Sequence, residues 1–252
     1  MGILSEKPDR KTRTSLPKFF RQLYATLGPQ HWWPARTRLE VILGSILTQN
    51  TSWRNVEKAL RSLRAHGWLR LSALRQVEGA ELAQAIRSAG FYRQKAATIR
   101  NFLTFLESEY DASLEKMFRQ PMPLLREQLL RIKGFGPETV DTILLYAGRH
   151  PSFVVDAYTR RILERHKLAS PSASYNEIQM LFHRSLKPDP AVFNEYHALL
   201  VETGKRFCKR AEPDCSRCPL EAYLPSPSSE GEVSVESLGK NPLHIGRVAN
   251  SG

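Results

Sequence analysis

A single carboxylate lies where an apolar run meets the start of a helical pattern. Asp156 closes the run FVVD, and Tyr158, Ile162 and Leu163 follow it at helical spacing. An aspartate at this place can cap the helix, because its side chain accepts hydrogen bonds from the first free N–H groups. A carboxylate held by an apolar run can also stabilise an oxocarbenium-like sugar or orient an attacking water, as glycosidic-bond cleavage requires. Both interpretations of Asp156 stay open on this segment alone.

A glycine-rich turn lies about one helix length before this aspartate. Lys133, Gly134, Phe135 and Gly136 connect one helical pattern to a second that begins with a proline. The two glycines allow positive φ and lack a Cβ, so backbone N–H groups can approach an anion, and the N-terminus of the next helix adds its dipole. A tight corner between two helices favours the same residue types. Lys133 and the basic charge of the chain favour the other interpretation, a helix-hairpin-helix that binds DNA phosphates.

The elements that must position these residues have the pattern of helices. Apolar residues recur at helical spacing, for example across residues 56–63, and alternating strand-like runs are almost absent. Loops that contain glycine or proline separate helical patterns of about ten to fifteen residues. We therefore predict an all-α protein. Residues 1–16 are polar and basic and residues 225–252 are rich in Ser, Gly and Pro, which predicts disorder at both ends.

Length and charge limit the classes of function. The chain has 252 residues, 41% of them hydrophobic, which suits one or two domains. Its 37 Lys and Arg exceed its 25 Asp and Glu, and a net charge of +12 favours a nucleic acid or an anionic membrane surface, although a merely basic protein has the same balance. No apolar run approaches the ~18–20 residues of a membrane span, and the N-terminus lacks a signal-peptide core. We expect a cytoplasmic protein with no membrane partner.

Several motifs occur in a fixed order along the chain. The segment GFGPETVDTILLYAGRHPSFVVDAYTRRI contains both the turn and Asp156, and the other motifs are ILGSILTQNTSW (42–53), GFYRQKAATI (90–99) and EYHALLVETGKRFCKRAEPDCSRCP (195–219). Together they resemble the endonuclease III, or HhH-GPD, superfamily of base-excision DNA glycosylases over roughly residues 30–224.

This resemblance implies a fold and an activity. The fold would be all-α and two-lobed, with a six-helix barrel lobe, a lobe of N- and C-terminal helices, and DNA in the cleft between them. The glycosylase domain would cover residues 17–224, with the helix-hairpin-helix at about 125–148 and a Cys-rich loop at 208–224. Such enzymes act as monomers, flip a damaged nucleotide out of double-stranded DNA and cut its N-glycosidic bond.

The positions that match the family carry its roles. Asp156 matches the catalytic aspartate, and Gly134 and Gly136 match the phosphate-binding hairpin. Gln49 matches a glutamine that lies near the lesion and helps to fill the gap left in the duplex. Members that also nick the backbone carry a nucleophilic lysine two residues after the second glycine, where this chain has Glu138. A carboxylate cannot form an imine, so we predict a monofunctional glycosylase that uses water and lacks AP-lyase activity.

Three residues near the predicted site, two of them tryptophans, indicate which damaged base the enzyme would remove. One branch of the family removes 3-methyladenine and related alkylpurines, and its pocket is lined by a tryptophan-proline pair and a second aromatic residue. Trp33, Pro34 and Trp53 resemble these pocket residues in type and spacing. We place Glu138 at the same pocket. An alkylated purine is cationic, gains ~0.5–2 kcal/mol over an indole face, and leaves readily, so one carboxylate without a strong general acid suffices. Core packing would explain the tryptophans as well.

All three cysteines, Cys208, Cys215 and Cys218, lie within eleven residues, which favours metal ligation over disulfides. Their spacing resembles the iron–sulfur loop of the superfamily, but the fourth ligand position holds Leu224. A [4Fe–4S] cluster normally needs four thiolates, so the alternatives are a cluster completed by an outside ligand, a degenerate site, or zinc bound by the three cysteines and a distant histidine. The resemblance also places the basic residues of this loop against DNA phosphates: Lys205, Arg206, Lys209, Arg210 and Arg217.

Three functions compete on this basis. The first is a monofunctional DNA repair glycosylase for alkylated purines. The second is an endonuclease III-type enzyme that excises oxidised pyrimidines and nicks the strand, against which Glu138 argues. The third is a non-catalytic helix-hairpin-helix module, which is disfavoured because Asp156, Gln49 and the pocket tryptophans occur together.

Overall fold

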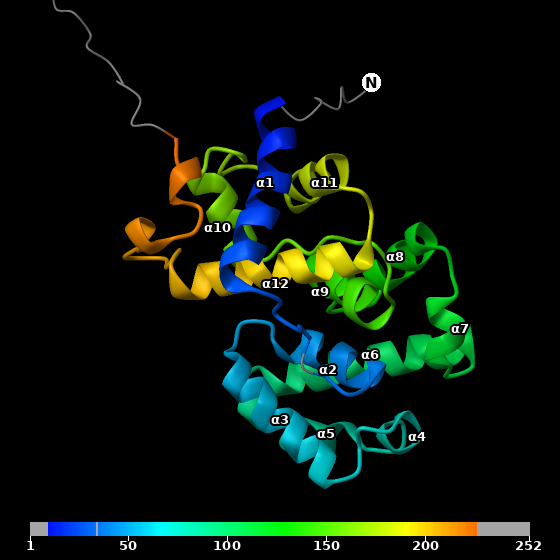
Figure 1. Ribbon diagram of the computed structural model, residues 1–252. Helices are drawn as coiled ribbons and strands as arrows, with labels where there is room; N and C mark the ends of the chain where they lie inside the picture. Colours follow the sequence, from blue (N-terminus) through cyan, green and yellow to red (C-terminus); the bar gives the residue numbers. More distant parts are fainter. Residues whose placement is uncertain (1–9, 34, 226–252) are drawn as a thin grey trace, which may run out of the picture.

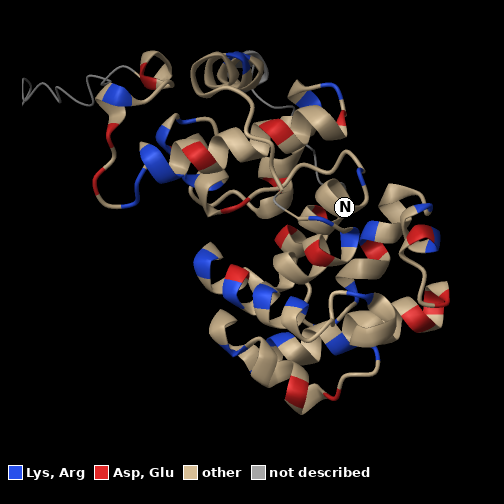
Figure 2. Ribbon diagram, turned by 60° about the horizontal axis from the view of Figure 1, so that its bottom comes forward, with Lys and Arg blue, Asp and Glu red and all other residues tan. Residues whose placement is uncertain are grey.

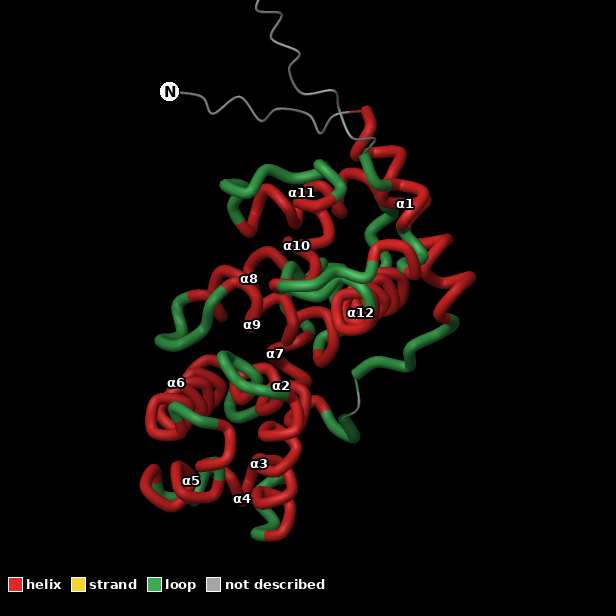
Figure 3. Tube along the Cα trace, turned by 90° about the vertical axis from the view of Figure 1, so that its left-hand side faces the viewer, coloured by secondary structure: helices red, strands yellow, loops and turns green. Residues whose placement is uncertain are grey.

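The computed structural model describes residues 10–33 and 35–225, with side chains from residue 15 onward. This part of the chain consists of helices and connecting loops, without a strand (Figures 1 and 3). The all-α prediction is therefore confirmed. No helix among these residues is long and apolar enough to cross a membrane.

The first lobe is built from the middle of the chain. Its buried apolar core runs from Leu39 to Ala147 and includes Phe102, Leu129 and Val140. Ten elements supply this core: α2 (Arg38–Leu47), α3 (Trp53–Ala65), α4 (Leu71–Leu74), α5 (Gly79–Ala85), η1 (Arg87–Ala89), α6 (Tyr92–Tyr110), α7 (Leu114–Phe118), α8 (Met122–Leu130), α9 (Pro137–Thr142) and the π-helix η2 (Ile143–Ala147).

The second lobe joins the two ends of the described chain. Its core combines Leu16 and Phe19 from the N-terminal helix with Phe153, Phe193 and Tyr196 from the C-terminal half. Figure 1 shows α1, α10, α11 and α12 above α2 to α6. The elements of this lobe are α1 (Arg10–Leu27), α10 (Ala157–Arg165), α11 (Tyr175–Ser185), α12 (Pro190–Arg206), η3 (Cys215–Arg217) and η4 (Glu221–Tyr223). The prediction of two lobes, one of them formed by the N- and C-terminal helices, is confirmed.

The π-helix η2 connects the two cores. Leu145 belongs to the buried core of the second lobe, whereas Ile143 and Leu144 belong to that of the first. Tyr146 packs against both cores. The segment that follows the glycine-rich turn therefore lies between the lobes.

The folded part of the chain begins earlier than the sequence predicts. Disorder is predicted through residue 16, but α1 begins at Arg10 and Leu16 is fully buried. The segment RKTRTSL has little apolar pattern of its own. Leu16 is buried by distant parts of the chain, and its carbonyl accepts a hydrogen bond from the Tyr196 hydroxyl at 2.9 Å. The rest of the predicted disorder, in residues 1–9 and 226–252, lies outside the described residues and stays a prediction.

Candidate active site

Asp156 lies at the N-terminus of α10, between the lobes. One carboxylate oxygen, Oδ1, accepts a hydrogen bond from the Thr159 backbone N–H at 2.7 Å, so Asp156 caps the helix. The other oxygen, Oδ2, is 3.6 Å from Nε2 of His197 on α12, and the Asp156 side chain is 14% exposed. Burial alone would raise the pKa of Asp156, but His197 and Thr159 outweigh it and lower the pKa below its ordinary value. Asp156 is therefore ionised at neutral pH.

His197 connects this carboxylate to a tyrosine of η2. The residue is 5% exposed, and its Nδ1 lies 2.6 Å from the Tyr146 hydroxyl oxygen. Its Nε2 is buried and has no hydrogen-bond partner among the described residues. Sequence reasoning missed both residues, which are separated by 51 positions. The available signal was His197 itself, a titratable residue inside the family-like motif EYHALLV.

Glu138 occupies the first turn of α9, close enough to Asp156 and His197 for both residues to affect its pKa. Its side chain reaches solvent, yet the surrounding protein displaces enough water to raise its pKa to about 7. The negative charge of Asp156 also raises the pKa, and His197 opposes the rise. No described lysine or arginine forms an ion pair with Glu138. Two carboxyl groups with opposite pKa shifts thus share this region.

Three aromatic side chains cluster beside the site. The Trp33 ring centroid lies 5.2 Å from that of Trp53 and 5.2 Å from that of Tyr146. Gly44 makes room for this arrangement, because a Cβ there would lie 3.2 Å from Cζ2 of Trp33. The tryptophans also pack against the first core, so they serve packing and can still present a ring face. Pro34, the third predicted pocket residue, is not among the described residues.

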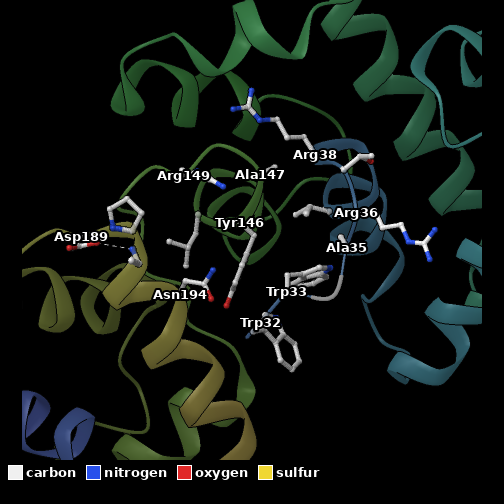
Figure 4. Close-up of a pocket in the computed structure, with 15 residues that line it drawn as sticks. Trp32, Trp33, Ala35, Arg36, Arg38, Tyr146, Ala147, Arg149, Asp189 and Asn194 are labelled. Atoms are coloured by element: carbon white, nitrogen blue, oxygen red, sulfur yellow. Dashed lines mark hydrogen bonds between the residues drawn. The ribbon is translucent and has the colours of Figure 1, made fainter. Parts of the chain in front are cut away.

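A pocket of about 800 Å³ opens between the lobes on one side of this aromatic cluster. Trp33 lines it, whereas Trp53 contacts Trp33 without lining it. Asp156 does not line this pocket either, and reaches it only through His197 and Tyr146. Figure 4 shows the aromatic and basic residues around it, which are Trp32, Trp33, Tyr146, Arg36, Arg38 and Arg149.

The two glycines of the glycine-rich turn adopt different backbone conformations. Gly134 has a φ of +100°, and a Cβ there would come within 2.2 Å of the Thr98 hydroxyl oxygen. Gly136 has a φ of −105° and forms the N-cap of α9, so it does not use the positive φ that a glycine allows. The amides of Gly134 and Gly136 have no acceptor among the described residues, whereas the Phe135 amide donates to the Ile132 carbonyl at 3.0 Å. Two backbone donors of the turn are thus available to an anion.

The side chains predicted to surround this turn are placed as follows. Phe135 is buried and stacks on Phe102 at 6.0 Å, so its side chain belongs to the core. Lys133 is exposed. Gln49 donates from Nε2 to the Thr139 hydroxyl at 2.7 Å, which ties the end of α2 to α9. Gln49, the turn and Glu138 therefore lie near one another.

A buried ion pair fixes the two helices of the hairpin. Arg126 of α8 donates to both carboxylate oxygens of Asp141 on α9, at 2.8 and 3.0 Å. Asp141 is fully buried and also accepts from the Ser152 hydroxyl at 2.6 Å. Breaking such a buried network by removing one partner is costly, so the hairpin is held rigidly.

The described residues of the Cys-rich loop do not surround a space that suits a metal centre. Cys208, Cys215 and Cys218 border a cavity of only about 20 Å³, room for about one water molecule. The sulfur of Cys208 accepts a hydrogen bond from Arg165 Nη1 at 3.1 Å, and the exposed Leu224 stands in the fourth position. Among the described residues, no group of three or more metal-ligating side chains could hold a metal ion. These residues therefore fit neither the predicted four-iron cluster nor the zinc alternative.

Two arginines of α10 hold the loop instead. Arg165 donates to the carbonyls of Lys209 and Arg210 at 2.7 and 3.1 Å, and Arg161 donates to the Cys208 carbonyl at 2.7 Å. The side chains of Lys205, Lys209 and Arg210 remain exposed. Lys205 also places its ammonium 4.9 Å from the Trp32 ring centroid, beside the pocket between the lobes. Figure 2 shows Lys and Arg on helices and loops of both lobes.

Comparison with known proteins identifies the family. The model of the family described as "HhH-GPD superfamily base excision DNA repair protein" matches residues 43–188 of the chain. The chain belongs to this superfamily. The Methanocaldococcus jannaschii protein MJ1434, described provisionally as a DNA repair glycosylase, is 42% identical over 208 residues, which cover 82% of this chain and 94% of that protein. The chain is thus a DNA repair glycosylase of the HhH-GPD superfamily.

Other members place the fold within the superfamily. Endonuclease III of Sulfolobus acidocaldarius is 27% identical over 189 residues, 75% of this chain and 82% of that protein. The Helicobacter pylori 3-methyladenine DNA glycosylase, solved with 1,N6-ethenoadenine, is 28% identical with a TM-score of 0.66 and covers 77% of this chain and 97% of its own. An endonuclease III–DNA complex, at 21% identity, has a TM-score of 0.72 over 84% of this chain and 94% of its own, which shows the shared fold.

Proposed function

We propose that this HhH-GPD glycosylase is monofunctional and removes alkylated purines, such as 3-methyladenine, from double-stranded DNA. The observation that carries the proposal is an ionised Asp156 one histidine away from the aromatic pair of Trp33 and Tyr146. A cationic purine gains about 0.5–2 kcal/mol over such rings. The similar Helicobacter pylori protein is a 3-methyladenine DNA glycosylase, which supports the same class of substrate.

The reaction is a heterolytic hydrolysis at C1′ of the deoxyribose. The electron pair of the C1′–N bond leaves with the purine and cancels its positive charge, so no strong acid is needed. The carboxylate of Asp156 stabilises the positively charged sugar that remains. Water then adds to C1′ and releases a proton through the carboxylate to solvent. The products are the free base and an abasic site in an intact strand.

Glu138 supports hydrolysis over strand nicking. The position is the one where bifunctional members carry the nucleophilic lysine, and a carboxyl group cannot form the imine that precedes β-elimination. Wild-type enzyme should yield no borohydride-trapped complex with DNA, whereas Glu138→Lys should yield one. A trapped wild-type complex that disappears in Lys133→Ala would show that a lysine on the other side of the turn acts instead, and would contradict this part of the proposal.

The DNA-binding surface follows from the same geometry. The free amides of Gly134 and Gly136, together with Lys133, are suited to one phosphate. Lys205, Lys209 and Arg210 are suited to further phosphates, and we propose that Gln49 fills the gap in the duplex, with the enzyme acting as a monomer in the cytoplasm. Because phosphate contacts by cations are sequence-independent, a Lys205→Ala, Lys209→Ala double variant should weaken binding to damaged and undamaged duplexes alike.

A lesion panel tests the substrate class. Duplex oligonucleotides that each contain one defined lesion are incubated with the enzyme, and the free base and strand integrity are measured separately. Release of 3-methyladenine or another alkylpurine without strand cleavage is the expected result. Release of oxidised pyrimidines with nicking would favour the endonuclease III-type activity, and binding without any release would favour a non-catalytic module; either result would overturn the proposal.

A further inference from the structure

One buried histidine spans the distance between the pocket wall and the catalytic carboxylate. Nδ1 of His197 lies 2.6 Å from the hydroxyl of Tyr146, a residue that lines the pocket between the lobes. Nε2 of the same ring lies 3.6 Å from Oδ2 of Asp156. Nε2 is buried, and at this separation it has no hydrogen-bond partner among the described residues. The ring is thus placed between two groups that the proposed reaction uses.

The contact with Tyr146 favours one tautomer of the His197 ring. Burial raises the pKa of Tyr146 well above its ordinary range, so the phenol stays protonated, and Nδ1 of His197 is the acceptor that the described residues offer its hydrogen. In a neutral imidazole that accepts at Nδ1, the proton is on Nε2. That N–H faces the Asp156 carboxylate. A buried N–H without an acceptor costs free energy, and Oδ2 of Asp156 is the acceptor that this geometry offers.

We propose that His197 is a positioning residue: through its Nε2–H it orients the Asp156 carboxylate for the glycosidic bond, and Tyr146 sets its tautomer from the wall of the base pocket. This inference rests on the proposed function only in naming the reaction that the oriented carboxylate serves. The Thr159 N–H donates to Oδ1 from within α10, and Nε2 of His197 faces Oδ2 from α12 at 3.6 Å, so two elements bear on the plane of the carboxylate. We expect this 3.6 Å separation to shorten to a hydrogen bond when substrate fills the site, as catalytic hydrogen bonds commonly do.

The titratable groups around the carboxylate come from three further elements, α9, α12 and η2. Glu138 on α9 adds a negative charge near Asp156, and His197 on α12 opposes its effect. Tyr146 on η2 is neutral and senses the charges of Asp156 and of Glu195. Two residues therefore favour the ionised form of Asp156: His197, and Thr159, whose backbone N–H donates to Asp156 at the cap of α10.

Direct NMR titration of the aspartate carboxyl groups tests the inference without any substrate. Protein labelled with ¹³C at aspartate carboxyl carbons is titrated, and Asp156→Asn identifies the resonance. In His197→Phe we expect Asp156 to titrate at higher pH than in the wild type. His197→Gln should restore part of the difference, because its amide N–H can replace Nε2–H. His166→Gln is the matched control, since His166 is also 5% exposed but bonds to the Tyr223 carbonyl.

Catalysis and the tautomer provide two further readouts. Single-turnover base release at pH 7 should fall on the order of 100-fold in His197→Phe and less in His197→Gln. Tyr146→Phe keeps the ring and removes the hydroxyl, so the ¹⁵N chemical shifts of His197 should show that the ring no longer prefers the tautomer with the proton on Nε2. This measurement does not depend on whether His197→Phe folds. An unchanged Asp156 titration in a folded His197→Phe or His197→Gln would overturn the inference. Failure of the wild type to release any alkylpurine would instead overturn the proposed substrate, and the titration would still stand.

Discussion

Two carboxyl groups at the candidate site respond to their surroundings in opposite directions. Asp156 has its pKa lowered, because His197 and Thr159 outweigh the effect of burial. Glu138 has its pKa raised to about 7, because the surrounding protein displaces water from its partly solvated side chain and the charge of Asp156 adds to this effect. Pairs of titratable groups whose pKa values are pushed apart are a common feature of active sites. At neutral pH one group is fully ionised and the other holds a proton in part of the molecules.

The raised pKa of Glu138 predicts a pH-dependent effect on stability. The ordinary pKa is 4.5 and the folded value is about 7, so between these values the folded state keeps a proton that the unfolded state loses. The contribution of Glu138 to stability therefore decreases as the pH rises through this window. Glu138→Gln should gain stability relative to wild type at pH 8 but not at pH 4, as measured by urea unfolding. Glu127→Gln, a substitution at an exposed position of α8, is the control. An equal gain in stability of Glu138→Gln at both pH values would contradict a raised pKa of Glu138.

At the scale of elements, the hairpin tolerates a side chain at one glycine and not at the other. Gly134 has positive φ and a close contact with Thr98, whereas Gly136 has negative φ and no atom within 4 Å of a Cβ. Gly134→Ala should lower the free energy of unfolding by about 1–3 kcal/mol, and Gly136→Ala should change it by less than about 1 kcal/mol. Thermal and denaturant unfolding measure both, and equal effects would show that the turn has a different backbone conformation.

The Cys-rich loop is predicted to keep its shape without metal. Hydrogen bonds from Arg161 and Arg165 hold its backbone, and the cavity between the cysteines has no room for a cluster. Purified protein should therefore lack the broad thiolate-to-iron absorption at about 400 nm, and chelators should leave its unfolding midpoint unchanged. A brown protein with stoichiometric iron would contradict this account of the loop.

At the scale of the whole molecule, features that depend on neighbouring residues could be predicted from the sequence, whereas features that depend on contacts between distant residues were mostly missed. Helical periodicity predicted the all-α class, and the run before Asp156 predicted its capping position, because both depend on neighbours in the chain. The pairing of Tyr146 with His197 was missed, since it joins residues 51 positions apart. Leu16 was assigned to a disordered segment for the same reason, because the groups that bury it lie in distant helices. Phe135 was placed with DNA although its ring is buried against Phe102.

The central claim is that the Asp156 carboxylate breaks the bond between an alkylated purine and its sugar. Single-turnover release of 3-methyladenine from duplex DNA by Asp156→Asn tests it most directly, because asparagine also caps a helix and preserves the shape of the site. Loss of the negative charge should slow release by at least about 10²–10³-fold, while DNA binding and the unfolding midpoint stay close to wild type. Release by folded Asp156→Asn within a few-fold of the wild-type rate would contradict the claim.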